Sequence, residues 1–163
     1  MKIAITGHSA GIGQALAKQF ENNGHEIVGL SRRNGYNIRS LPKVAGMIEP
    51  CDMFVNNAQV GYAQTELLFE VWRRWQGQQK YIVNVSTRMT DMLLPPKEEW
   101  DEYIIQKKAL ELANQLLENR NSWPRLLLVR PGGIATQPGQ TPPEYMDVDE
   151  YAQGVYAWIA KNI

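Results

Sequence analysis

The sequence predicts an α/β protein with a three-layer, doubly wound fold and a mainly parallel sheet of about six strands. Short apolar runs of strand type alternate along the chain with longer segments of helical periodicity. Such alternation joins parallel strands through helical crossovers. The apolar runs are nearly continuous, which is typical of strands covered on both faces. In such sheets ligands bind beyond the carboxyl ends of the strands, so chemistry is expected there.

Each expected strand is a short apolar run that stops at a polar or turn-forming residue. The first run stops at Gly7, and the last stops at Pro131, where a regular strand cannot easily continue. The shortest candidate is residues 36–38. The expected strands are residues 2–6, 26–30, 36–38, 52–55, 81–85 and 125–129.

The expected helices carry apolar residues at helical spacing. In the first of them Ile12, Leu16 and Phe20 share one face, and Gly24 is placed to end the helix. Pro42 lies in the first turn of the second, where proline is favoured. The expected helices are residues 11–22, 41–48, 65–75, 97–118 and 147–159, and residues 137–143 are turn-rich.

Composition excludes several classes of function. The 163 residues suit one domain. The 17 basic residues balance the 17 acidic ones, which argues against nucleic acid or an acidic membrane surface as the main partner. One cysteine and two histidines cannot form a disulfide framework or a typical zinc site. No apolar run approaches the roughly 18 residues of a membrane span, so we expect a cytoplasmic protein without metal.

A glycine-rich turn follows the first expected strand and opens the first expected helix. It reads Thr6-Gly7-His8-Ser9-Ala10-Gly11-Ile12-Gly13. Glycines let the backbone approach a phosphate closely, and a helix N-terminus offers it unpaired amides. This context predicts nucleotide binding, although an ordinary strand-to-helix turn is the alternative. We expect His8 to be an exposed loop residue.

The end of the second expected strand indicates which nucleotide binds. It reads Ser31-Arg32-Arg33, where an acidic residue would suit a ribose 2′-hydroxyl. Guanidinium groups pair well with phosphate. The sequence therefore favours NADP(H) over NAD(H), with a solvated basic turn as the alternative.

Tyr103 and Lys107 are four residues apart on an expected helix and therefore share a face. A nearby ammonium lowers the pKa of a tyrosine, and such a phenol can exchange protons near neutral pH. Ser86 and Thr87 end the strand at 81–85, where a hydroxyl can donate to a developing oxyanion. The alternatives are a surface polar pair and a simple turn hydroxyl.

In their order along the chain these residues resemble the short-chain dehydrogenase/reductase family, whose fold is of the Rossmann type. The resemblance covers most of the chain. One departure is Gln59, which stands where the family's Asn-Asn-Ala-Gly motif has glycine. The similar segments are Thr6-Gly7-x-x-x-Gly11-Ile12-Gly13, Asn56-Asn57-Ala58, Asn84-Val85-Ser86-Thr87, Tyr103-x-x-x-Lys107 and Pro131-Gly132-Gly133-Ile134-Ala135-Thr136.

The resemblance implies hydride transfer between NADP(H), or alternatively NAD(H), and a small carbonyl or alcohol substrate. Tyr103 would be the general acid or base, and Lys107 would lower its pKa and hold the nicotinamide ribose. The Ser86 or Thr87 hydroxyl would orient the substrate oxygen. The implied cofactor-binding residues are Thr6, Gly7, Ser9, Gly11, Ile12, Gly13, Ser31, Arg32, Arg33, Asn37, Asn57, Ala58, Tyr103, Lys107, Pro131, Gly132, Ile134 and Thr136.

Other departures imply a trimmed member of the family, a single domain over residues 1–163 with a short C-terminal substrate segment. The interval from Asn57 to Asn84 fits one helix where the family has two. The asparagine of the family's catalytic tetrad has no clear counterpart, and Gln59 is the provisional candidate. Residues 94–97 read as an insertion, and the family's seventh strand is not expected.

The family's helices before and around the Tyr-Lys pair form a dimer surface. Leu68, Trp72 and Trp75 could serve it, so a homodimer or homotetramer is expected. Two other functions remain open. The chain could be a non-catalytic NADP(H) sensor or scaffold. Last in rank is a nucleotide-sugar epimerase or dehydratase, which generally has a larger C-terminal region.

Overall fold

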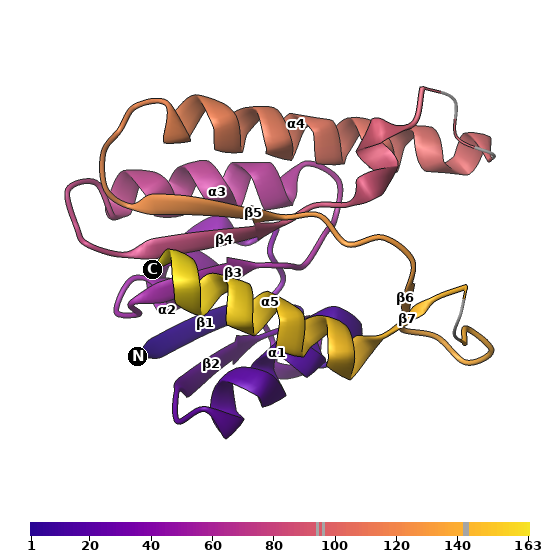
Figure 1. Ribbon diagram of the computed structural model, residues 1–163. Helices are drawn as coiled ribbons and strands as arrows, with labels where there is room; N and C mark the ends of the chain where they lie inside the picture. The colour runs from indigo at the N-terminus through magenta and orange to yellow at the C-terminus, as the bar shows by residue number, and fades with distance from the viewer. Residues whose placement is uncertain (94, 96, 142–143) are drawn as a thin grey trace.

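The computed structural model describes residues 1–93, 95, 97–141 and 144–163. Its main sheet has five parallel strands in the order β2-β1-β3-β4-β5 (Figure 1). A second, two-stranded parallel sheet follows in the chain. The strands are β1 (Lys2–Thr6), β2 (Glu26–Leu30), β3 (Met53–Asn56), β4 (Tyr81–Val85), β5 (Arg125–Val129), β6 (Ile134–Ala135) and β7 (Met146–Asp147).

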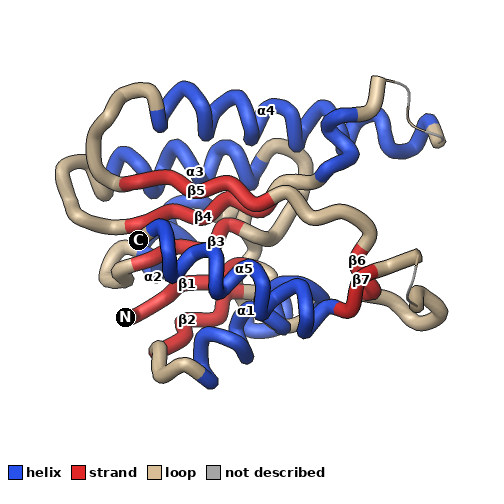
Figure 2. Tube along the Cα trace, viewed as in Figure 1, coloured by secondary structure: helices blue, strands red, loops and turns tan. Residues whose placement is uncertain are grey.

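Helices cover both faces of the main sheet (Figure 2). One face packs against α1 and α5, and the other packs against α2, α3 and α4. Neighbouring residues of a strand point to opposite faces, so Phe54 joins one core and Met53 the other. The helices are α1 (Gly11–Asn22), α2 (Leu41–Ile48), α3 (Ala63–Arg74), α4 (Asp101–Glu118) and α5 (Val148–Asn162), with short 3-10 turns η1 (Arg32–Asn34), η2 (Arg88–Asp91) and η3 (Glu98–Trp100).

The predicted fold class is confirmed: the chain forms a three-layer, doubly wound α/β structure. Four strands of the main sheet and two helices begin and end at the expected residues. The expected helix at 97–118 is instead η3 followed by α4. Residues 94, 96, 142 and 143 fall within the expected insertion and turn-rich segment but lie outside the described residues.

The strand expected at residues 36–38 is wrong. Gly35 adopts a left-handed conformation, with φ of 86°, and the Tyr36 amide donates to the Ser31 carbonyl oxygen at 2.8 Å. This bond turns the chain back toward the end of β2, so the segment cannot extend alongside it. The result leaves β2 at the edge of the sheet.

The order of the strands reverses between β1 and β3, because the chain moves outward to β2 first and then to β3, β4 and β5. In doubly wound sheets this switch point opens a crevice at the carboxyl ends of the strands, where ligands bind. The loops after β1 and β3 flank that crevice here.

The residues expected to serve a dimer surface are part of the chain's own core instead. Leu68 and Trp75 are fully buried and Trp72 is 7 % exposed. The Trp75 indole also donates to the Glu49 carbonyl oxygen at 3.2 Å. The expectation is wrong because α3 contacts α2 on one side and α4 on the other, which covers its apolar face.

Replacing Trp75 by alanine should therefore lower the free energy of unfolding by about 3–5 kcal/mol, the usual cost of removing a large buried aromatic side chain. Urea denaturation of the wild type and the variant measures this. Trp158→Ala is the control, since Trp158 is 40 % exposed; its loss should be much smaller. Equal losses would contradict the burial of Trp75 in this core.

Candidate functional site

The turn between β1 and α1 is built so that its backbone comes unusually close to itself and to the loop after β3. Gly7 has a φ of 72°, a conformation that side chains disfavour. A Cβ atom there would lie 2.8 Å from Nδ2 of Asn57, and one on Gly13 would collide with the Gly7 carbonyl oxygen. Helix α1 starts at this turn without a side-chain cap, so its first amides are available to an anion.

Thr6 and Asn57 tie the two loops at the switch point together. The buried Thr6 hydroxyl accepts from the amides of Asn57 at 3.0 Å and Ala58 at 3.1 Å. The Asn57 side chain donates to the Thr6 carbonyl oxygen at 3.0 Å. Both side chains are occupied by these bonds, so they shape the crevice. Neither Thr6 nor Asn57 is among the residues that line it.

A cleft of about 280 Å³ lies at the carboxyl ends of β1, β2 and β3. It brings together seven of the residues that the sequence predicts for cofactor binding, which come from three separate loops. It also includes Tyr36 and Gln59, which the sequence did not assign to it. The predicted lining residues are Gly7, Ser9, Ser31, Arg32, Arg33, Asn37 and Ala58.

The basic end of the cleft carries two exposed guanidinium groups. Arg33 reaches across to donate to the Ser9 carbonyl oxygen at 3.2 Å, so it spans from the end of β2 to the glycine turn. The Ser31 hydroxyl is already used within its own turn, because it donates to the Asn34 side chain at 3.2 Å. The arginines are therefore the groups at this end that suit a phosphate.

His8 is not the exposed loop residue that the sequence predicts. It is half-buried, and its ring lies against Gly29 of β2, where a Cβ atom would overlap it. Its Nδ1 is buried without a partner among the described residues. The missing side chain at Gly29 explains the difference.

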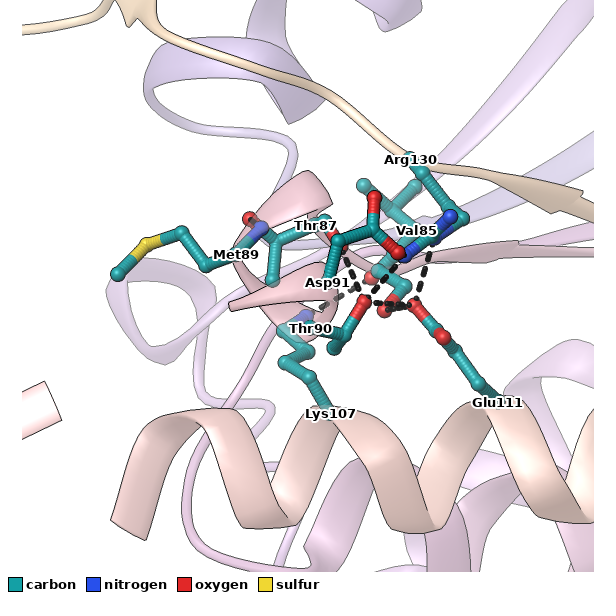
Figure 3. A network of polar contacts seen from close by, with 9 residues as sticks. Val85, Thr87, Met89, Thr90, Asp91, Lys107, Glu111 and Arg130 are labelled. Atoms are coloured by element: carbon teal, nitrogen blue, oxygen red, sulfur yellow. Dashed lines mark hydrogen bonds and ion pairs between the residues drawn. The ribbon is translucent and has the colours of Figure 1, made fainter. Parts of the chain in front are cut away.

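Tyr103, Lys107 and Thr87 converge beyond the end of β4 (Figure 3 shows the surroundings of Thr87 and Lys107). Lys107 is 3 % exposed and donates to Oε1 of Gln64 and to the Val85 carbonyl oxygen, both at 2.8 Å. Its Nζ lies 5.7 Å from the centre of the Tyr103 ring. Burial lowers the pKa of Lys107 to about 8, and the nearby Glu111 carboxylate opposes this.

Burial raises the pKa of Tyr103 above its ordinary value, and a hydrogen bond with the Thr87 side chain opposes this rise only in part. The direction is opposite to the lowered pKa that the sequence predicts. The reason is geometric, since the Lys107 amine is bonded to Gln64 and Val85 and not to the phenol.

The structure separates the two hydroxyls that the sequence leaves as alternatives. Ser86 donates to Oε1 of Glu111 at 2.6 Å, on the side toward the middle of α4. The Thr87 side chain lies instead close enough to Tyr103 to act on the pKa of its phenol. Of the two hydroxyls, Thr87 is therefore the one on the side of Tyr103.

Gln64 is a site residue that the sequence analysis missed. Its Oε1 accepts from Lys107, and its Nε2 donates to the carbonyl oxygens of Asn56 at 2.7 Å and Val85 at 3.0 Å. The provisional candidate, Gln59, pairs with Gln106 instead. A signal was available, because Gln64 precedes Leu67, Leu68 and Val71 by three, four and seven residues and so extends the buried face of α3.

The segment after β5 crosses the carboxyl edge of the sheet from Thr87 to the glycine turn. The Pro131 carbonyl oxygen accepts from the amide of Arg88 at 2.8 Å. At the far end Thr136 lies against Gly11, where a Cβ atom would be 3.5 Å from the threonine side chain. Pro131, Gly132, Ile134 and Thr136 are thus all placed along the same edge. The described residues contain no cluster that could hold a metal ion and no helix suited to crossing a membrane.

Comparison with known proteins shows which families and folds this chain is similar to. Residues 3–66 match the family described as NAD dependent epimerase/dehydratase. That stretch runs from β1 to the start of α3 and includes the glycine turn and the cleft. No curated protein matches the sequence significantly.

Three solved structures illustrate the likeness. A short chain dehydrogenase from Burkholderia cenocepacia in complex with NADP is 16 % identical with a TM-score of 0.81, over 98 % of this chain and 84 % of that one. The bulky-bulky ketone specific alcohol dehydrogenase from Comamonas testosteroni is 19 % identical with a TM-score of 0.73, over 98 % and 82 %. The 3-ketoacyl-(acyl-carrier-protein) reductase from Brucella melitensis complexed with NADH is 15 % identical with a TM-score of 0.74, over 95 % and 88 %. The chain therefore has the fold of the short-chain dehydrogenases, and the resemblance predicted from the sequence is confirmed at that level.

The lowered pKa of Lys107 predicts a pH dependence of stability. Its pKa is about 8 in the folded chain and about 10.5 when exposed, so between these values the unfolded chain binds more protons than the folded one. The Lys107 contribution to the free energy of unfolding therefore rises with pH across this window, by up to about 1.4 kcal/mol per pH unit. Urea denaturation from pH 7.5 to 10 should show this rise in the wild type and lose it in Lys107→Met. Lys108→Met, which removes an exposed amine at the next position, is the control and should keep the rise.

Proposed function

We propose that this chain is an oxidoreductase of the short-chain dehydrogenase/reductase type, which transfers hydride between NADP(H) and a small carbonyl or alcohol substrate. The observation that carries the proposal is the convergence of Tyr103, Lys107 and Thr87 on the edge of the sheet that also holds the cleft beside the glycine turn. The fold shared with dehydrogenases supports it, as does the match to an NAD-dependent family over the cleft.

The residues of the cleft fit a dinucleotide. Gly7 and Gly13 have no room for side chains of their own, and α1 presents unpaired amides, so this part suits the pyrophosphate. Arg32 and Arg33 would hold the 2′-phosphate of the adenosine end, beside Asn37 and Ala58. When bound, NADP(H) supplies or accepts the hydride, and NAD(H) is the alternative cofactor.

Tyr103 fits the part of a proton donor. Because burial raises its pKa, the phenol keeps its proton at neutral pH and can give it to a carbonyl oxygen that is being reduced. The Thr87 hydroxyl, which pairs with that phenol, would orient the same oxygen. In the reverse reaction Tyr103 accepts the proton.

Lys107 supports this step through its charge. With a pKa of about 8 it is mostly protonated at neutral pH, and its amine lies one helical turn from Tyr103. A positive charge there stabilises the phenolate that remains after proton transfer. Gln64 positions this amine by accepting a hydrogen bond from it.

We also propose that the protein is a homodimer or homotetramer, through α4 and not through the tryptophans of α3. Ile105, Leu112 and Leu116 are each more than half exposed, and their spacing of seven and four residues places them on one stripe of the helix. A monomer mass in light scattering would contradict this part of the proposal.

The change Tyr103→Phe tests the reaction. It removes the donated proton and leaves the ring, so NADPH consumption with a panel of aldehydes and ketones should fall by at least about a hundredfold. The affinity for NADPH, measured by calorimetry, should stay within about threefold, which corresponds to less than about 0.7 kcal/mol. A variant as fast as the wild type would exclude Tyr103 as the proton donor. Tight NADPH binding by a wild type that turns over none of these substrates would favour the sensor or scaffold instead.

The double change Arg32→Ala and Arg33→Ala tests the choice of cofactor. Loss of two guanidinium groups should weaken NADPH binding by about tenfold or more, the equivalent of at least one charged hydrogen bond. Binding of NADH, which lacks the 2′-phosphate, should change little. Arg39→Ala is the control, since Arg39 is exposed in the same region but does not line the cleft. Equal losses for both cofactors would contradict a 2′-phosphate site.

A further inference from the structure

The η2 turn, which directly follows Thr87, is held by side chains from two other parts of the chain. Glu111 comes from the middle of α4, and Arg130 follows the end of β5. Figure 3 shows both side chains reaching the turn, Arg130 from the end of β5 above it and Glu111 from α4 below it. We call Glu111 and Arg130 together the brace.

The contacts of the brace are short and mostly directed at one atom. Oε1 of Glu111 accepts from Ser86 Oγ at 2.6 Å and from Arg130 Nε at 3.0 Å, and lies 2.9 Å from Thr90 Oγ1. Nη2 of Arg130 donates to Thr90 Oγ1 and to Asp91 Oδ1, both at 2.5 Å. The brace therefore fixes Ser86, which precedes Thr87, and both Thr90 and Asp91 at the far end of the turn.

Thr90 carries this constraint to Thr87. Its hydroxyl donates to the Thr87 carbonyl oxygen at 2.8 Å, and Thr87 Oγ1 accepts from the Met89 amide at 3.3 Å. Ser86, Thr87 and Thr90 are all more than 90 % buried. The position of the Thr87 hydroxyl thus follows from that of the turn.

We propose that Glu111 and Arg130 are positioning residues, which hold Thr87 in register with the phenol of Tyr103. The inference rests on the proposed function. It assigns Glu111 and Arg130 a part in the reaction that does not depend on contact with the substrate. Hydride transfer is sensitive to small displacements of the groups that orient the reacting oxygen. A brace across three segments is a means of limiting such displacements.

The brace is not needed to keep the strand ends together. The Ser86 amide donates to the Val129 carbonyl oxygen at 2.8 Å, and the Arg88 amide to that of Pro131 at 2.8 Å. These backbone bonds do not involve the brace. Loss of the brace should therefore loosen the η2 turn without unfolding the sheet edge or the cofactor cleft.

The test compares Glu111→Ala and Arg130→Met with the wild type, using hydrogen–deuterium exchange and NADPH-dependent reduction of the aldehyde or ketone that the wild type reduces fastest. In both variants the amides of residues 89–91 should exchange at least tenfold faster. The kcat should fall about tenfold or more, while the dissociation constant for NADPH should change less than twofold. Glu111→Gln, which keeps an oxygen acceptor for Ser86, should recover most of the protection and part of the kcat.

Arg74→Met is the matched control. Arg74 pairs with Glu70 at 2.9 Å and Glu49 at 2.8 Å, and its exposed fraction of 30 % is close to the 32 % of Arg130. Arg74 lies at the end of α3, in an outer helical layer. The exchange of residues 89–91 and the kcat should therefore both remain at wild-type values.

Unchanged exchange and unchanged kcat in both brace variants would overturn the inference. So would a parallel loss of NADPH binding, which would mean that the brace supports the fold in general. Should Glu111→Ala fail to fold, Arg130→Met carries the test, because its side chain is more exposed. A wild type that reduces no substrate would end the proposed function, and the exchange of residues 89–91 would then decide alone whether the brace holds the turn.

Discussion

The site depends on hydrogen-bond acceptors for one buried positive charge, the ammonium group of Lys107. An ammonium removed from water is stable only when acceptors surround it, and Lys107 finds two, on Gln64 and on the Val85 backbone. These acceptors are fixed in turn by buried amides. Asn56 donates to Asn84 at 2.9 Å, and Asn84 donates to Asn114 at 2.9 Å. This chain of amides joins β3, β4 and α4, so the core that stabilises the sheet also orients the lysine.

The cleft at the glycine turn and the side chains around Tyr103 are built separately but share one edge of the sheet. The cleft depends on backbone proximity, through the glycines of the first turn and the cross-tie between Thr6 and Asn57. The cluster around Tyr103 depends on side chains from α3, α4 and the end of β4. Parallel strands bring the two together because all of their carboxyl ends lie at one edge. This explains why residues about a hundred positions apart in the sequence meet at one site.

The features that sequence could predict are those decided locally. Strands β1, β2, β4 and β5 follow from continuous apolar runs, and the glycine turn from its context between a strand and a helix. Residues 36–38 were misjudged because the bond from Tyr36 to Ser31 overrides their strand propensity. The role of Glu111, the partner of Gln64 and the choice of Thr87 over Ser86 could not be predicted, since each depends on side-chain contacts between residues far apart in the sequence. The direction of the Tyr103 pKa failed for the same reason, because helical spacing gives proximity and not the bond that the lysine makes.

The single hydrogen atom that serves as the side chain of Gly29 determines where the imidazole of His8 resides. Because that space is free, the ring lies directly against Gly29. His8 also lines the hollow formed by α1 and the segment around Thr136. A larger residue at position 29 would overlap the ring and force it to move. One methyl group in an edge strand would thus displace a side chain whose two chain neighbours, Gly7 and Ser9, line the cleft.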